Sequence, residues 1–115
     1  MTRTVQDSTQ VKNFASGNWV VRSGAEGDFV SRWTEFLVWT RENASGLFEA
    51  MLMRDADKAR HYISMSEWDS MEAVLAWRSL PGFAEKLDAC RVLCEEFSSS
   101  NYTLAAALEV VEVVA

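Results

Sequence analysis

The segment Arg60–Phe83, RHYISMSEWDSMEAVLAWRSLPGF, decides the fold of this chain. Its first part alternates along the backbone, and alternation of this kind predicts a strand over residues 59–68. Asp69, with a glutamate three residues later, resembles a capping box that opens a helix. Pro81-Gly82 then interrupts that helix, because proline cannot continue the hydrogen-bond pattern. The segment therefore predicts a strand, a tight connection and a broken helix.

Similar patterns on either side of this segment predict the remaining elements. Asp28 is the expected N-cap of the first helix, and Gly17 in the first strand indicates a bulge or a close backbone approach. Apolar residues after Pro81 follow one another at spacings of four, three, four and three, which predicts that the helix continues to about residue 97. They are Phe83, Leu87, Cys90, Cys94 and Phe97. The expected strands are 13–23, 47–54, 59–68 and 104–114, the expected helices are 28–43, 69–80 and 83–97, and 98–101 is an expected loop.

The order of these elements is β-α-β-β-α-β, which is typical of the ferredoxin-like, split βαβ class of α+β folds. Residues 1–12 are polar and aperiodic, so we expect a flexible N-terminal arm before a single domain of residues 13–115. The expected last strand, 104–114, is apolar on both faces apart from Glu109 and Glu112. Such a strand needs cover, so we expect a homodimer.

Composition excludes several classes of partner. The formal net charge of −6 and the scattered basic residues argue against nucleic-acid binding, which needs clustered Lys and Arg. Apolar stretches are too short to predict a membrane span. The first ten residues lack the apolar region of a signal peptide, so we expect a cytoplasmic protein. Cys90 and Cys94 lack the spacing of a redox or zinc motif, and we interpret them as reduced core thiols; no metal site is expected.

Four short motifs resemble the antibiotic-biosynthesis monooxygenase family, which belongs to the dimeric α+β barrel superfamily. They are DFVSRW at Asp28–Trp33, the Ser45-Gly46 break, EWDS at Glu67–Ser70 and AWRSLPGF at Ala76–Phe83. The resemblance extends over roughly residues 18–110. It implies a ferredoxin-like domain that pairs into a homodimeric barrel, but the family includes more than one chemistry.

One branch of the family consists of cofactor-free monooxygenases that oxidise anthrone-like polyketide aromatics with molecular oxygen. The resemblance implies that Trp68 forms part of the pocket and that Ser64 stands where that branch has an asparagine. Asn18 matches a first-strand asparagine of the family. A site of this kind needs polar groups that stabilise a phenolate and a cavity that excludes water.

The other branch degrades haem and uses a first-strand asparagine, a helical tryptophan and a histidine. Asn18 and Trp77 match the first two, but Lys86 and Leu87 occupy the neighbourhood of the histidine. Without that imidazole the usual coordination of the haem iron is lost. His61, the only histidine, alternates onto the strand face opposite Trp68.

The prediction is a cofactor-independent oxygenase that acts on a phenolic or quinol-type aromatic, without metal. The alternatives are a haem-binding or haem-degrading protein and a non-catalytic dimer that binds a small molecule. We expect the site to lie in an apolar cavity between the sheet and the helices. The candidate catalytic residues are Asn18, Ser64, Trp68 and Trp77, and the candidate substrate-binding residues are Trp33, Phe36, Tyr62, Val74, Phe83 and Leu87, with Phe29 as a further wall.

Overall fold

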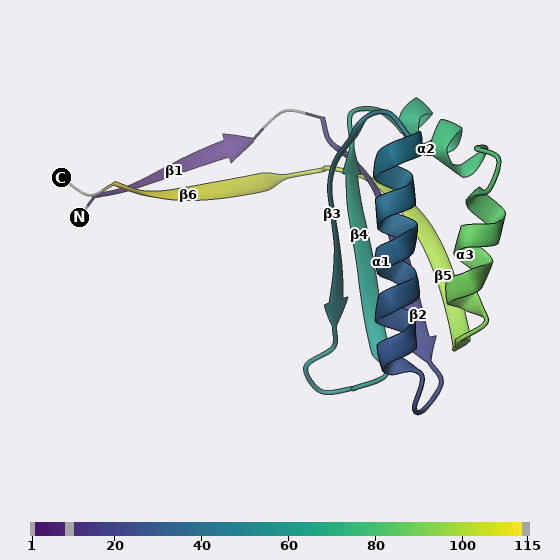
Figure 1. Ribbon diagram of the computed structural model, residues 1–115. Coiled ribbons are helices and arrows are strands. Elements are labelled where there is room, and N and C mark those ends of the chain that lie inside the picture. The colour runs from purple at the N-terminus through teal and green to yellow at the C-terminus, as the bar shows by residue number, and fades with distance from the viewer. Residues whose placement is uncertain (1, 9–10, 114–115) are drawn as a thin grey trace.

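Three helices cover one face of a four-stranded antiparallel sheet in the computed structural model, which describes residues 2–8 and 11–113 (Figure 1). The strand order in this sheet is β3-β4-β2-β5. The order of the elements from β2 to β5 therefore confirms the predicted ferredoxin-like α+β fold. The elements are β1 (Thr2–Ser8), β2 (Asn13–Val21), α1 (Glu26–Asn43), β3 (Leu47–Arg54), β4 (His61–Trp68), α2 (Met71–Arg78), α3 (Phe83–Arg91), β5 (Cys94–Thr103) and β6 (Ala107–Val113).

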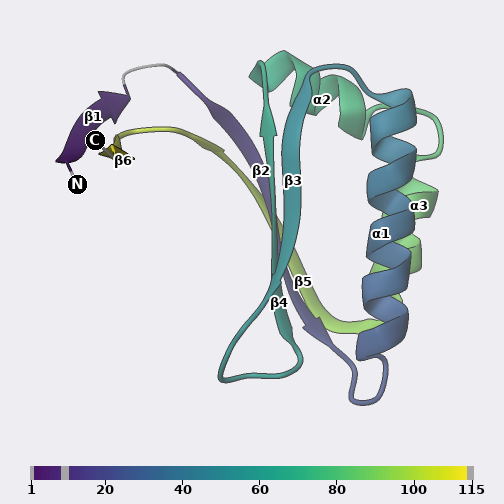
Figure 2. The same ribbon diagram turned by 60° about the vertical axis from the view of Figure 1, so that its left-hand side comes forward.

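The hydrophobic core lies between the sheet and the helices, all of which are on the same side (Figure 2). Alternate residues of β2 are buried, and the same period along β4 buries Tyr62, Ser64 and Trp68. This period of two puts one strand face on the core. The prediction that Trp68 and His61 lie on opposite faces of their strand is confirmed.

The first two helices each start two residues away from the prediction, whereas α3 starts at Phe83 as predicted. Helix α1 begins at Glu26 after Ala25, without a side-chain cap, so the expected N-cap at Asp28 is wrong. Asp28 instead lies in the first turn, where an acid stabilises the helix dipole. The cap of α2 is Ser70, whose Oγ accepts from the backbone N–H of Ala73, and not Asp69. No helix in the described part of the chain combines the length and apolar character that crossing a membrane requires.

The predicted helix 83–97 is too long, because α3 ends at Arg91 and β5 begins at Cys94. The strand-to-strand register between β2 and β5 shifts at Val20 and Val21, which pair with Glu96 and Cys94. A bulge of this kind lets residues three apart lie on one strand face. Cys94 and Phe97 therefore both face the core from a strand, although their spacing is typical of a helix.

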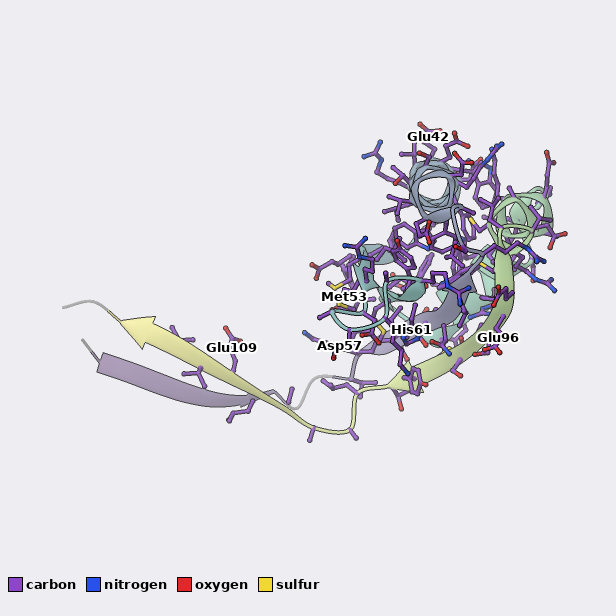
Figure 3. The ribbon with its side chains drawn as sticks, turned by 90° about the horizontal axis from the view of Figure 1, so that it is seen from below. Glu42, Met53, Asp57, His61, Glu96 and Glu109 are labelled. Carbon is purple, nitrogen blue, oxygen red and sulfur yellow. The ribbon has the colours of Figure 1, made fainter. Side chains whose placement is uncertain are left out.

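The fourth strand of the sheet is β5, so the prediction that residues 104–114 close the sheet, and that 98–101 are a loop, is wrong. Strand β6 instead pairs with β1 in a separate two-stranded ribbon, from Thr2 with Val113 to Ser8 with Ala107. The ribbon leads away from the domain, and Glu109 lies on it far from Glu42 on α1 (Figure 3). Residues 2–8 thus form a paired strand; the flexible arm of residues 1–12 and the single domain of residues 13–115 remain predictions.

Candidate active site

A cavity lies between the inner face of the sheet and the three helices. The walls are mostly apolar and aromatic, with residues of all four strands of the sheet on one side and of α1, α2 and α3 on the other. The space between atoms is about 580 Å³, including a part open to solvent, but centres of water-sized molecules can occupy only about 60 Å³. A flat aromatic ligand would therefore need side chains at the wall to move.

Most of the predicted site residues meet in this cavity. Helix α1 contributes two of them, β4 two, α2 one and α3 two. Trp68 and Trp77 pack with ring centroids 4.9 Å apart, and Phe36 stacks on Trp77 at 5.8 Å. The predicted residues that line the cavity are Trp33, Phe36, Ser64, Trp68, Trp77, Phe83 and Leu87.

Tyr62 and Val74 do not line this cavity, so their predicted place in its wall is wrong. Both are buried in the core: Tyr62 packs against Phe29 at 5.2 Å, and Val74 lies in the cluster around Trp68. Phe29 is fully buried and is also absent from the lining. These three residues support the cavity wall from behind.

Asn18 lies on the opposite face of the sheet, because the buried positions of β2 are the odd-numbered ones. There its Oδ1 lies 2.5 Å from Nε2 of His61, whose Nδ1 lies 2.9 Å from Oδ2 of Asp55. The structure thus does not bring Asn18 together with Ser64. Asn18 therefore lies outside the cavity that Ser64 lines, although both were expected among the catalytic residues.

The hydrogen bond between Asp55 and His61 on the outer face of the sheet predicts that the stability of the fold depends on pH. A hydrogen bond from His61 and backbone N–H groups of Asp57 and Lys58 lower the pKa of Asp55 from 3.8 to about 2. Because the pKa is lower in the folded state, these contacts stabilise the fold fully above pH 3.8, and the effect is lost as pH falls through about 2. In urea titrations the difference in unfolding free energy between wild type and Asp55→Asn should shrink from pH 5 to pH 2. A difference that does not change with pH would contradict this assignment.

The indole N–H groups of the three tryptophans on the sheet and α2 are all committed to protein acceptors. Trp19 donates to Ser64 Oγ at 3.1 Å, Trp68 to Ser66 Oγ at 2.8 Å and Trp77 to Thr40 Oγ1 at 3.0 Å. These rings therefore offer a ligand their faces and edges, and no free N–H donor. The contribution of Trp68 and Trp77 to the site is apolar and aromatic.

Ser64 places a hydroxyl group of β4 on the inner face of the sheet, in the lining of the cavity. Its Oγ accepts from Trp19, and a hydroxyl group that accepts one hydrogen bond keeps its own proton to donate. Gly17 makes this pair possible, since a Cβ at that position would lie 2.5 Å from Trp19 Nε1 and 2.7 Å from Ser64 Oγ. The close neighbours of Gly17 are thus side-chain atoms and not a second backbone, and β2 has no bulge at Gly17, because its register with β4 and β5 is unbroken there.

The cavity does not fit the haem alternative. Leu87 lines the wall near the expected ligand position, and His61 is on the other face of the sheet with both ring nitrogens in hydrogen bonds. The lining contains no His, Cys or Tyr among residues 2–8 and 11–113, and Met65, which is in the lining, belongs to a ligand type that holds haem iron together with a histidine. Across the same residues there is no cluster of three or more His, Cys, Asp or Glu side chains that could hold a metal ion.

Cys90 and Cys94 are both free and buried, which confirms their predicted place in the core. Burial raises the pKa of Cys90 to about 12, with a smaller effect of Cys94. The thiol of Cys90 is therefore protonated at neutral pH. A protonated thiol is a poor nucleophile.

Sequence reasoning missed several residues of the cavity. Trp19 donates a hydrogen bond to Ser64, and Thr40 accepts one from Trp77. Phe97 packs on Trp19 with ring centroids 4.2 Å apart. The alternation of β2 gave a usable signal for Trp19, which is two residues after Gly17 on the same face. Arg78 was also missed, although it lies in the quoted AWRSLPGF motif.

The fold and the cavity together define a class: ferredoxin-like α+β domains with an aromatic cavity between sheet and helices. The sequence profile of the antibiotic biosynthesis monooxygenase family matches residues 15–87, more than half of the chain. The chain therefore belongs to this family. No curated protein matches its sequence.

Solved structures confirm the fold at low sequence identity. SnoaB, a cofactor-independent oxygenase from Streptomyces nogalater, is 23% identical with a TM-score of 0.67, over 84% of this chain and 93% of that chain. A protein of Shewanella oneidensis is 13% identical with a TM-score of 0.70, over 95% and 100%. A conserved protein of Methanosarcina mazei is 11% identical with a TM-score of 0.72, over 80% and 91%.

Proposed function

We propose that this protein is a cofactor-independent monooxygenase that oxidises a phenolic or quinol-type aromatic with molecular oxygen. The observation that carries the proposal is the cavity itself: aromatic walls with a hydroxyl group, Ser64, on the floor. Such a cavity suits a flat, mostly apolar ligand with few polar groups. Membership of the monooxygenase family and the similarity to SnoaB support the same chemistry.

The reaction requires the protein to position the substrate and to exclude water from the cavity. In an anthrone-type substrate, transfer of a proton to solvent gives a phenolate, a ring carbon of the phenolate bonds to one oxygen atom of O₂, and the peroxide anion that forms takes up a proton. The resulting hydroperoxide becomes a carbonyl group and releases the other oxygen atom as water. Ser64 would donate a hydrogen bond to the substrate oxygen as negative charge develops there, and Trp68 and Trp77 would hold the ring.

Oxygen uptake by metal-free protein tests this proposal. Protein dialysed against a chelator should consume oxygen with an anthrone, a dihydroanthraquinone or a quinol faster than the uncatalysed reaction. Ser64→Ala should lower this rate by about tenfold or more, because the removed donor stabilises developing charge. A rate equal to the uncatalysed background across the panel would contradict the proposal.

A second candidate is a non-catalytic dimer, and the small free space of about 60 Å³ in the cavity favours it. In that case the aromatic side chains would fill the core, and no ring would enter between them. Tryptophan fluorescence distinguishes the candidates, because an aromatic ligand in the cavity should quench it. Failure of every aromatic in the panel to bind would favour the non-catalytic role.

A homodimer belongs to the same proposal. Apolar side chains are exposed on the outer face of the sheet, at Met51, Met53 and Tyr102, and on the β6 ribbon at Leu108 and Val110. Isolated two-stranded ribbons are marginally stable in water, so cover by a second copy would stabilise this one. Light scattering should give the mass of a dimer, and Met51→Glu combined with Met53→Glu should shift it toward the monomer. A monomeric wild type at micromolar concentration would contradict the dimer.

A further inference from the structure

One charged side chain stands in the wall of the aromatic cavity. Arg78 is the last residue of α2, and it is the only charged residue of the lining within the part of the chain that the structure describes. Its Nη2 donates to Oδ1 of Asn101 on β5 at 2.7 Å, and its guanidinium carbon lies 5.8 Å from the centroid of the Trp77 ring. Both contacts hold the guanidinium group against the cavity wall.

The guanidinium group of Arg78 is incompletely paired. Its Nε is buried and has no hydrogen-bond partner among the described residues. Other arginines meet carboxylates, as Arg60 meets Glu95 at 3.1 Å, but within the described ranges Arg78 forms no such ion pair. A buried donor without an acceptor costs about 1–3 kcal/mol, and more when it is charged. The fold therefore retains an unfavourable feature that an oxygen of a ligand would relieve.

We propose that Arg78 is the specificity-determining residue of this site and recognises a carboxylate on the aromatic ligand. The inference rests on the proposed aromatic-binding function. Arginine presents Nε and a neighbouring Nη on one planar edge, and this edge matches the two oxygens of a carboxylate. Asn101 supplies only one neutral acceptor, which leaves Nε for the ligand.

The charge balance of the cavity favours an anionic group over a neutral one. Desolvation by burial lowers the pKa of Arg78, but arginine remains protonated at neutral pH. No carboxylate of the lining neutralises this charge in the described residues. Because the chain carries a net charge of −6, attraction of an anion must be local to Arg78. Hydrogen bonds between two charged groups are about twice as strong as neutral ones.

A matched pair of ligands tests the inference without any need for turnover. Anthraquinone-2-carboxylate and its neutral primary amide share the ring and differ in charge. Binding is measured at pH 7.5 by quenching of tryptophan fluorescence. Wild type should bind the carboxylate about tenfold tighter than the amide or better. Arg78→Gln should abolish this preference and leave the amide affinity within about twofold, since Gln keeps a neutral donor.

Two further variants keep the test decisive. Arg78→Lys retains the charge without the planar guanidinium group, so its preference for the carboxylate over the amide should be intermediate. This variant replaces Arg78→Gln in the test if Arg78→Gln does not fold. Arg91→Gln is the matched control, because Arg91 pairs with Asp88 and is absent from the cavity wall; it should behave as wild type.

The possible failures are distinguishable. If wild type binds both ligands equally, or if Arg78→Gln keeps the preference for the carboxylate, the role of Arg78 is overturned and the aromatic site stands. If neither ligand binds to wild type, the proposed aromatic-binding function is overturned and this inference with it.

Discussion

Trp68→Ala is expected to lower the free energy of unfolding by about 3–5 kcal/mol, the largest effect of any single change considered. The side chain is 1% exposed and packs against Ala15, Val74 and Trp77. Removing it deletes most of one core cluster and leaves a cavity that the surrounding strands cannot fill. Since domains of this size are stable by only about 5–15 kcal/mol, the variant would be close to unfolding.

Urea denaturation at fixed protein concentration measures this effect. Trp68→Phe distinguishes the packing of the ring from the hydrogen bond of its N–H. It should lower the free energy of unfolding by about 1–2 kcal/mol, because the hydrogen bond to Ser66 is lost and most of the packing is kept. Leu75→Ala on α2 is the control, since Leu75 is 54% exposed and should change stability by less than about 0.5 kcal/mol. A loss below about 1 kcal/mol for Trp68→Ala would contradict its place in the core.

Gly17→Ala is expected to destabilise the fold by about 1–3 kcal/mol, although the change adds only a methyl group. The added Cβ would collide with the Trp19 indole and with Ser64 Oγ. Trp19 cannot easily move aside, because its ring lies between Phe29 and Phe97 at centroid distances of 5.3 and 4.2 Å. The substitution should therefore break the Trp19–Ser64 hydrogen bond as well as strain the core.

Gly27→Ala is the matched control for this prediction. Gly27 lies in α1, and no atom is within 4 Å of the position that its Cβ would take. Alanine favours helix over glycine by about 0.8–1 kcal/mol, so this variant should be as stable as wild type or more stable. Equal stability of Gly17→Ala and wild type would show that the indole has room to move.

The regular parts of the fold were predictable from the sequence because burial follows the backbone period. The alternation of 59–68 placed Tyr62, Ser64 and Trp68 on the core face, and the structure confirms it. The error came at residues 83–97, where the bulge beside Cys94 gives two strand residues a helical spacing. A local pattern cannot reveal a bulge that depends on how β5 pairs with β2.

The site was predictable as a set of aromatic residues but not as a hydrogen-bond arrangement. The acceptors of the indole N–H groups of Trp19 and Trp77 are 45 and 37 residues away in the sequence. The incomplete pairing of Arg78 likewise depends on Asn101, which belongs to a strand that the sequence had indicated as a loop. These contacts arise from packing between distant segments, so the sequence pattern carries no direct signal for them.

In the proposed function an aromatic substrate reacts with oxygen inside the cavity between the sheet and the helices. Ala50 lines that cavity from β3, whereas Ala84 is exposed on α3. The most direct measurement is oxygen uptake with a quinol or anthrone by folded Ala50→Phe and Ala84→Phe, each compared with wild type. The added ring should fill the cavity in the first variant, so its rate should fall by about tenfold or more while the second stays within about twofold. A folded Ala50→Phe as active as wild type would contradict the placement of the reaction in this cavity.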